Sequence, residues 1–528
     1  MKIISYILIF HLFVSVVNFE QSKKFIYIIL IPSFVVCLYG FLQYFFIFKT
    51  SNLVFDFSLG DIVKNSLERK RIFSFFLLPN TLAGYIVMLI PLSASCFMIY
   101  KKQKMLFFML LIFLFISLFL TLSLGGWISL IFSFFIFLCL LGKVKNILFF
   151  ETGINWCNKM FFLKEKNPAI NNKEKLFKIK NIKNIFIVIF LLFIILFFIF
   201  LCRKNDIIGY NPIMSRFRTS IDTLKIIKDY PFGTGFGTFS SIYPKYKSIE
   251  SGTMQHCHNS FLELTSEIGI HGFFFFLLFL FCLINFIFKK IKSLDFENKI
   301  LCFGFISGSI GFLIHNLFDF DFYIPNLSIL AVIFLGFPLM FLEKKKIEIK
   351  SSFKKFIIIF FVIISLIYLS YIFCVYQSEV HFNKAKNIFK DNIDRSIEEY
   401  QISKKLNPLN YLPYAHLGYC YKFKGEILKA IDAYSQSIKL NPHLPYLHKD
   451  IGILYLQKGD MNKAIFEIQK ASELYPNNAY YHLLLAVIYK KLHYNNDFLK
   501  EYKKALFIEK DIEKINQEFE KIFMNFSQ

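Results

Sequence analysis

The sequence has few of the features that mark a metalloprotein, a disulfide-bonded protein or an ion-coupled transporter. Its 10 cysteines form no C-x-x-C pair and no cluster with metal-ligand spacing, and most lie in apolar runs, where cysteine behaves as a small hydrophobic residue. Acidic residues are nearly absent from the middle of those runs, whereas intramembrane carboxylates are typical of transport pathways. Residues 1–20 lack the small-residue cleavage site of a signal peptide, so we interpret them as a membrane helix or its remnant. We therefore expect no disulfide framework, no metal site and no cofactor.

Apolar residues, by contrast, are in excess. Of the 528 residues, 55% are hydrophobic and 72 are phenylalanine, whereas a soluble domain averages about 45–50% apolar residues. Apolar runs near the ~20 residues needed to cross a bilayer recur as far as residue 375. They cover residues 3–18, 25–47, 81–99, 105–123, 126–142, 184–202, 272–288, 300–318, 326–342 and 356–375. The predicted fold class is all-α, beginning with a polytopic membrane helical bundle of about ten spans.

The positive charge of the chain indicates its orientation. Lys and Arg number 61 against 37 Asp and Glu, a formal net charge of +24. Lysine clusters occur at alternate connections between the runs, whereas the connections around Leu124 and at 319–325 have no Lys or Arg. By the positive-inside rule the clusters are cytoplasmic, and an outer loop at 203–258 and everything after Tyr376 lie outside. The charge therefore needs no nucleic acid to explain it, and we expect no nucleic-acid partner.

Residues 376–528 have a soluble, helical composition with a period of 34 residues. Repeats begin at Tyr411, Pro445 and Ala479, and small residues recur in them where two helices would pack closely. The pattern resembles the tetratricopeptide repeat (TPR), which implies an α-solenoid with a concave binding face. We therefore expect two domains, a transmembrane domain at 1–375 and a TPR domain at 376–528 that binds a partner protein.

Two polar clusters on the predicted outer side carry arginine. Arg71 precedes Pro79 and Asn80, where the third span begins and either Asn80 or Thr81 is expected to cap its helix. Arg216 and Arg218 precede a glycine-rich segment, P-x-G-x-G-x-G, that follows no strand and so does not predict a dinucleotide loop. Guanidinium groups donate bidentately to phosphate oxygens, which makes a pyrophosphate ligand one interpretation. A snorkelling arginine at a capped helix, and surface arginines on a soluble loop, are the alternatives.

Two further clusters carry histidine. His256 and His258 end the outer loop, and they have no third ligand at a spacing that would favour a metal. A histidine near neutral pH can act as a general base, although a solvated structural histidine is the alternative. His315 and Asp319 lie at the end of the eighth span, either in a site or in a network that positions helices. Because all four clusters share the outer side, we expect them to converge on one site.

Together these clusters resemble the O-antigen ligase family. The segments R-x-x-S-x-x-x-x-P-N-x-x-A-G at 71–84, P-x-G-x-G-x-G-x-F at 231–239 and H-N-x-x-L-x-x-x-x-E-x-G-x-x-G at 258–272 are similar to that family in order and spacing. The resemblance implies a metal-independent, inverting, GT-C-like glycosyltransferase. It would transfer a glycan from undecaprenyl pyrophosphate to lipid A core or another acceptor, in lipopolysaccharide or cell-surface polysaccharide biosynthesis. The enzyme would lie in the bacterial inner membrane, with its site and its TPR domain in the periplasm and membrane lipid around its spans.

The resemblance also implies roles for single residues. His258 matches the histidine taken as general base for the acceptor hydroxyl, and Arg216 or Arg218, with Arg71, would hold the pyrophosphate. Asn259 and Glu267 would shape the helix entry and orient His258. The substrate-binding positions that follow are Arg71, Arg216, Arg218, Asn259, Glu267, His315 and Asp319. One departure stands out, because the family often has arginine where this chain has Leu124.

The sequence leaves the acceptor open. A polysaccharide polymerase and a protein O-oligosaccharyltransferase share this chemistry and differ from a ligase only in the acceptor. A non-catalytic transporter or assembly scaffold that recruits partners through its repeats is the alternative from a different class.

Overall fold

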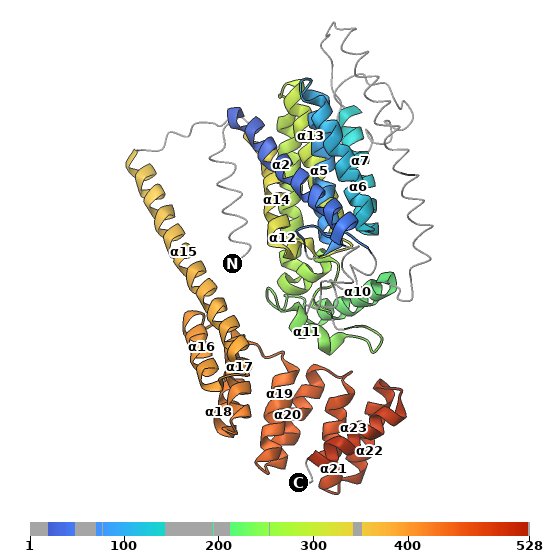
Figure 1. The fold of residues 1–528 in the computed structure, drawn as a ribbon, viewed down its shortest axis with the longest axis vertical. Coiled ribbons are helices and arrows are strands. Elements are labelled where there is room, and N and C mark those ends of the chain that lie inside the picture. Colours follow the sequence, from blue (N-terminus) through green and yellow to red (C-terminus); the bar gives the residue numbers. More distant parts are fainter. Residues whose placement is uncertain are drawn as a thin grey trace. The chain divides into compact units, whose positions relative to one another are not determined.

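In the residues that the computed structural model describes, all regular secondary structure is helical (Figure 1). The described residues are 19–47, 70–76, 78–142, 194, 212–252, 254–341 and 351–525. Two predicted spans, 3–18 and 184–202, therefore lie outside them apart from Ile194. The chain divides into two compact units. The bundle unit comprises Met1–Ser220, Pro231–Gly233 and His256–Lys344, and the repeat unit comprises Ile221–Tyr230, Thr234–Gln255 and Lys345–Gln528.

The bundle unit consists mainly of apolar helices. They are α2 (Phe19–Leu42), α5 (Pro79–Ile99), α6 (Lys104–Thr121), α7 (Leu124–Gly142), α12 (Ser260–Ile291), α13 (Phe296–His315) and α14 (Pro325–Gly336), with short helices η1 (Gln43–Ile47), η3 (Asp321–Tyr323) and η4 (Phe337–Phe341). Across the described residues of both units, seven helices are long and apolar enough to cross a membrane, and α14 with η4 forms a shorter apolar segment. These segments coincide with the predicted runs that fall within the described residues, so this part of the fold prediction is confirmed.

Small residues on α13 allow the central helices of the bundle to approach closely. A Cβ atom added at Gly304 would collide with Ser95 of α5, and one added at Gly308 would collide with the Met88 carbonyl oxygen. Membrane helices associate through such close packing, because lipid supplies no hydrophobic force between them. Figure 1 shows α5, α7 and α13 running side by side. The packing buries Trp127 completely in this core.

Helix α12 is broken by one residue. Gly269 has φ 77° and ψ 168°, values outside the helical region, and the Ile270 amide donates instead to the Pro231 carbonyl at 2.9 Å. Gly233, with φ 90°, packs its backbone directly against this break. Only residues without a Cβ allow two backbones to cross so closely. This crossing explains two of the glycines in the P-x-G-x-G-x-G and E-x-G segments without a ligand.

The C-terminal part of the repeat unit begins with one long helix, α15 (Ser351–Ile388), which contains the candidate span Val362–Ile388. The expected boundary after residue 375 falls inside this helix, so the apolar span continues without a break into the repeats. The C-terminal part of α15 packs Phe382 and Ala385 into a core with Tyr400 of the next helix. This pairing makes the end of the span the first helix of the solenoid.

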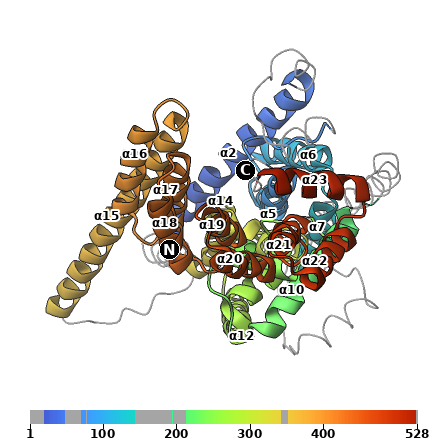
Figure 2. The same ribbon diagram turned by 90° about the horizontal axis from the view of Figure 1, so that it is seen from below.

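The remaining helices form the predicted pairs. They are α16 (Ile393–Leu406), α17 (Tyr411–Phe423), α18 (Ile427–Leu440), α19 (Pro445–Gln457), α20 (Met461–Leu474), α21 (Ala479–Lys491), α22 (Asn495–Ile508) and α23 (Ile512–Asn525). Figure 2 shows α16, α17 and α18 packed in sequence order. The predicted repeat starts Tyr411, Pro445 and Ala479 are the first residues of α17, α19 and α21, which confirms the predicted period.

Candidate functional site

The side chain of Asp319 joins residues from two other predicted clusters, all within the bundle unit. Its Oδ1 lies 3.6 Å from Nδ1 of His258, and its Oδ2 lies 3.8 Å from Nη2 of Arg216. Both distances are longer than hydrogen bonds, and the contact with Arg216 is an ion pair. Burial opposes ionisation of this carboxyl group, but the neighbouring His258 and Arg216 outweigh it and hold the pKa of Asp319 below its usual range. The site is therefore built on a buried carboxylate between a cation and an imidazole.

The start of α12 fixes the position of His258. Asn259 is the N-cap of α12, and its Oδ1 accepts hydrogen bonds from the Phe261 and Leu262 amides. The Ser260 amide donates to the carbonyl oxygens of Asn316, at 2.8 Å, and of Asp319, at 3.1 Å. These contacts tie the first turn of α12 to the segment after α13. The predicted role of Asn259 in shaping the helix entry thus has a direct structural basis.

His258 itself adopts an uncommon backbone conformation, with φ 56°. A residue with a Cβ in this left-handed region stores on the order of 1–3 kcal/mol of strain, which the surrounding structure must offset. The imidazole retains 26% exposure although Nδ1 is buried against Asp319. The second nitrogen, Nε2, is therefore the one available to a substrate.

Glu263, which the sequence analysis did not single out, anchors the loop in front of His258. Its side chain is 1% exposed. Its Oε1 lies 2.7 Å from Nδ1 of His256, and its Oε2 accepts a hydrogen bond from the Cys257 amide at 2.8 Å. Phe320 stacks on His256, with ring centroids 4.4 Å apart, and meets His258 edge-on at 5.2 Å. The two imidazoles thus turn Nδ1 to different carboxylates.

Glu267 lies one turn further along α12 and accepts a hydrogen bond from the Tyr323 hydroxyl at 3.0 Å. Burial, and then the charges of Glu263 and Glu267, raise the pKa of Tyr323, so this hydroxyl keeps its proton. Glu267 thus fastens α12 to η3. Its described hydrogen bond supports the packing around the site rather than His258 directly.

A second buried pair lies beside the first. Nδ1 of His315 is 2.7 Å from Oδ2 of Asp321, and each side chain is 1% exposed. Nε2 of His315 and Oδ1 of Asp321 are buried and have no hydrogen-bond partner among the described residues. Gly84 of α5 lies directly against the Asp321 carboxylate, where any Cβ would collide. The glycine of the predicted 71–84 segment is therefore required by this pair. Burial raises the pKa of Asp321 to about 6.

Arg71 joins the ends of two helices. Its Nη2 donates to Oδ1 of Asn80 and its Nε donates to the carbonyl oxygen of Thr121, both at 2.8 Å. The predicted cap by Asn80 or Thr81 is wrong, because α5 begins at Pro79, its N-cap is Leu78 and no side chain caps it. The Asn80 amide oxygen is used by the arginine instead. Arg71 thus lies beside the turn that leads into α7.

Arg218 lies on the same helix as Arg216, α10 (Pro212–Asp229), and is half-buried. Residues two apart on a helix project in different directions. Arg216 is the one of the two whose described ion pair is with Asp319.

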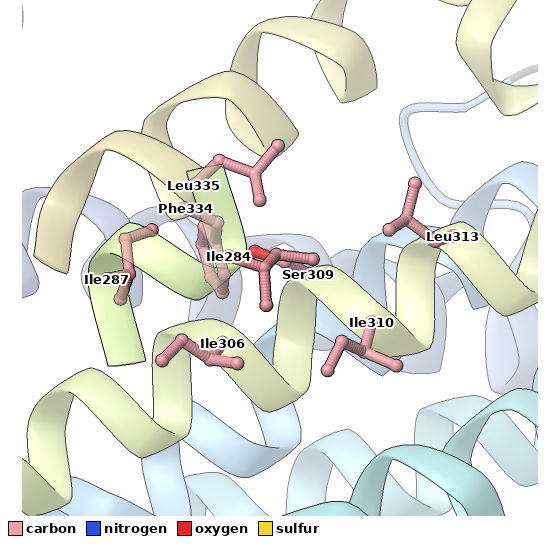
Figure 3. Close-up of a pocket in the computed structure, with 8 residues that line it drawn as sticks. All are labelled: Ile284, Ile287, Ile306, Ser309, Ile310, Leu313, Phe334 and Leu335. Atoms are coloured by element: carbon pink, nitrogen blue, oxygen red, sulfur yellow. The ribbon is translucent and has the colours of Figure 1, made fainter. Parts of the chain in front are cut away.

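A separate small apolar cavity of about 10 Å³, room for about one water molecule, lies between α12, α13 and α14 in the bundle unit. Figure 3 shows its lining side chains, which are Ile284, Ile287, Ile306, Ser309, Ile310, Leu313, Phe334 and Leu335. The hydroxyl of Ser309 donates back to the Phe305 carbonyl at 2.9 Å, so the lining offers little to a polar ligand.

Comparisons with known proteins agree with the resemblance described above. Residues 107–277 match a family model described as O-antigen ligase, and residues 424–488 match a tetratricopeptide repeat model. The predicted resemblance to O-antigen ligases with C-terminal tetratricopeptide repeats is thus confirmed. The first match includes the segments 231–239 and 258–272 and leaves out 71–84. It indicates a multi-pass membrane protein of a glycosyl-transferring type.

Among solved structures, MamA is 23% identical over 26% of this chain and 81% of its own, with a TM-score of 0.25. YrrB, titled a TPR protein with an unusual peptide-binding site, is 16% identical over 26% of this chain and 89% of its own, with a TM-score of 0.18. A comparison with curated proteins finds no match.

Proposed function

We propose that this protein transfers a glycan from undecaprenyl pyrophosphate to an acceptor hydroxyl at the periplasmic face of the bacterial inner membrane. The family match supports the coarser statement, an O-antigen ligase-like membrane glycosyltransferase. The observation that supports the proposed transfer reaction is the His258–Asp319–Arg216 arrangement, because a base and a cation lie on either side of one buried carboxylate.

In the proposed reaction His258 is the general base. Asp319 faces Nδ1 and favours the tautomer with its proton there, which leaves Nε2 to accept the proton of the acceptor hydroxyl. The acceptor oxygen then forms a bond to the anomeric carbon, while the bond from that carbon to the pyrophosphate oxygen breaks, with inversion. The buried charge of Asp319 stabilises the imidazolium that results.

Arg216 is the proposed ligand for the departing pyrophosphate. Its side chain is 31% exposed, so part of the guanidinium remains open to a ligand while Asp319 positions it. Arg71 is the alternative substitute for the arginine that the family often has at Leu124. Because both described hydrogen bonds of Arg71 go to protein acceptors, we assign it to holding the turn before α7. Arg218 is a secondary candidate on α10.

The acceptor is the open part of the proposal. Lipid A core, a growing polysaccharide and a protein each present a hydroxyl or equivalent nucleophile, and the site chemistry above applies to all three. The TPR domain is the proposed contact for a protein partner or acceptor. We favour the ligase, because the family model matched is described as O-antigen ligase.

The test uses His258→Ala in the full-length protein, supplied with lipid-linked glycan in proteoliposomes. We expect glycan transfer to fall on the order of 10²-fold or more, with membrane abundance unchanged, since a positioned general base contributes about that much. His271→Ala is the matched control, because His271 is an exposed histidine of α12, the helix that His258 precedes, and it stacks on Phe232. Transfer at the parental rate by the His258 variant would refute the catalytic assignment. Mass analysis of the product identifies the acceptor.

A further inference from the structure

The TPR helices hold a segment of the chain's own outer loop. Within the repeat unit, α11 (Phe239–Tyr246) and the residues after it contact the turns between repeats. Nδ2 of Asn441 donates to the Ser241 hydroxyl at 3.0 Å, and Nζ of Lys247 donates to the Tyr475 hydroxyl at 2.8 Å. Nδ2 of Asn477 donates to the Lys247 carbonyl at 2.7 Å. The segment is therefore bound through both its side chains and its backbone.

The repeat residues in this contact are placed regularly. Asn441 directly follows α18, and Tyr475 directly follows α20. They are 34 residues apart and so occupy the same position in successive repeats. The contact thus uses one edge of the solenoid, at the ends of the second helices, where each repeat presents an equivalent side chain.

Lys247 is the anchor of the contact. It is only 9% exposed, and lysine is rarely buried so far without partners. Its ammonium group lies 5.1 Å from the centre of the Tyr475 ring, in addition to the hydrogen bond with the hydroxyl of that residue. A loop lysine held in this way loses conformational freedom, which the paired contacts must offset.

The residues after Lys247 close onto helix α10. Asp222 of α10 is 1% exposed, and its Oδ2 accepts hydrogen bonds from the Ser248 amide and the Ser251 hydroxyl, both at 2.9 Å. The Tyr246 hydroxyl donates to Asp229 at 2.7 Å. Burial and this carboxylate raise the pKa of Tyr246, so the donor stays protonated. The segment 239–251 therefore binds the repeats on one side and α10 on the other.

We propose that the repeat domain acts as an internal clamp on the outer loop. By holding segment 239–251 it fixes Asp222, and α10 continues without a break from Asp222 back to Arg218 and Arg216. Arg216 and Asp222 are six positions apart in this helix, about 9 Å along its axis, so the helix connects the two residues directly. This role goes beyond partner recruitment. The effect of the clamp on glycan transfer rests on the function proposed above, whereas the contact between the repeats and the outer loop does not.

The test compares amide hydrogen exchange in full-length protein in lipid nanodiscs. The double variant Asn441→Ala/Asn477→Ala removes two of the donors. We expect exchange at 239–251 and 221–229 to become on the order of 10-fold faster, with α17 to α20 still protected. Gln436→Ala/Gln469→Ala is the matched control, because it removes two amides of the same repeats that bond elsewhere. Unchanged exchange in the outer segment overturns the proposal.

A second variant decides the result if the double variant loosens the repeats themselves. Lys247→Met keeps the length of the side chain and removes only the loop's own donor. Faster exchange at 239–251 supports the clamp, and parental exchange overturns it. In transfer assays the same variants should raise the KM for the lipid-linked donor more than they lower kcat, and Lys247→Arg should restore it. Amide exchange at 239–251 would still become faster in these variants if the protein transferred no glycan. The clamp and the proposed transfer activity can therefore be refuted independently.

Discussion

Asp319 and Asp321 are two residues apart and both are buried, but their environments shift their pKa values in opposite directions. Asp319 faces His258 and Arg216, which keep it ionised. Asp321 has the His315 ring as its partner, and its burial outweighs that partner's charge. Carboxyl groups whose pKa values are pushed apart in this way mark candidate active sites, since one can serve as a fixed anion while the other exchanges a proton.

The raised pKa of Asp321, about 6, makes a pH-dependent contribution to stability. A carboxyl with a pKa above its unfolded value of ~3.9 binds more protons when folded, so its contribution falls as pH rises from about 4 through 6. In Asp321→Asn this dependence is absent. We therefore expect the free energy of unfolding of the variant to rise, relative to that of the parent, by on the order of 1 kcal/mol between pH 4.5 and pH 7.

The measurement is the thermal unfolding midpoint of both purified proteins across that range. Asparagine keeps an oxygen that can face Nδ1 of His315, so the comparison isolates the titration. A difference between the two proteins that is constant with pH, or that changes in the other direction, would contradict the assignment.

At the level of helices, the break in α12 is the feature that positions the site, because it sets the direction of the turns that carry Glu263 and Glu267. In Gly269→Ala the new Cβ would collide with the backbone of Pro231 and Phe232 and would hold a left-handed φ. The φ alone costs on the order of 1–3 kcal/mol, so unfolding should occur at a markedly lower temperature.

Gly235→Ala is the matched control for this prediction. Gly235 also has a positive φ, 103°, but a Cβ there would meet only Thr238, at 3.5 Å. Both proteins are compared by thermal unfolding. Equal losses in the two variants would mean that backbone strain matters and that the crossing at Gly269 does not.

The helices show which features the sequence could predict. Apolar runs located the spans, because hydropathy is a local property. The predicted apolar run begins at residue 272, whereas α12 begins at Ser260, because its first turns are polar and bury Glu263 and Glu267 against other segments. The pairing of Gly233 with Gly269 also escaped prediction. Contacts between residues far apart in the chain leave no periodic pattern, so these glycines invited a ligand interpretation.

The same limit applies to the site. His258, Arg216, Asp319 and His315 were singled out individually, whereas their grouping around two carboxylates depends on how α10, α12 and α13 meet. Glu263 was missed because a glutamate in the first turn of a helix is common and favourable in itself. Only its contacts with His256 and Cys257 distinguish it.

At the scale of the whole molecule, the question is whether the repeats recruit a partner, hold the outer loop or do both. Ending the chain after Pro408 keeps α15 paired with α16 and removes Asn441, Tyr475 and Asn477. If the clamp operates, this truncation should raise the donor KM at least as far as Asn441→Ala/Asn477→Ala does. If the repeats also recruit, it should further reduce transfer to the natural acceptor relative to a small soluble one.

Steady-state transfer with both acceptors, normalised to membrane abundance, separates the two effects. A truncated protein whose donor KM equals that of the parent would leave recruitment as the sole role of the repeats, because the clamp acts on the donor side through α10.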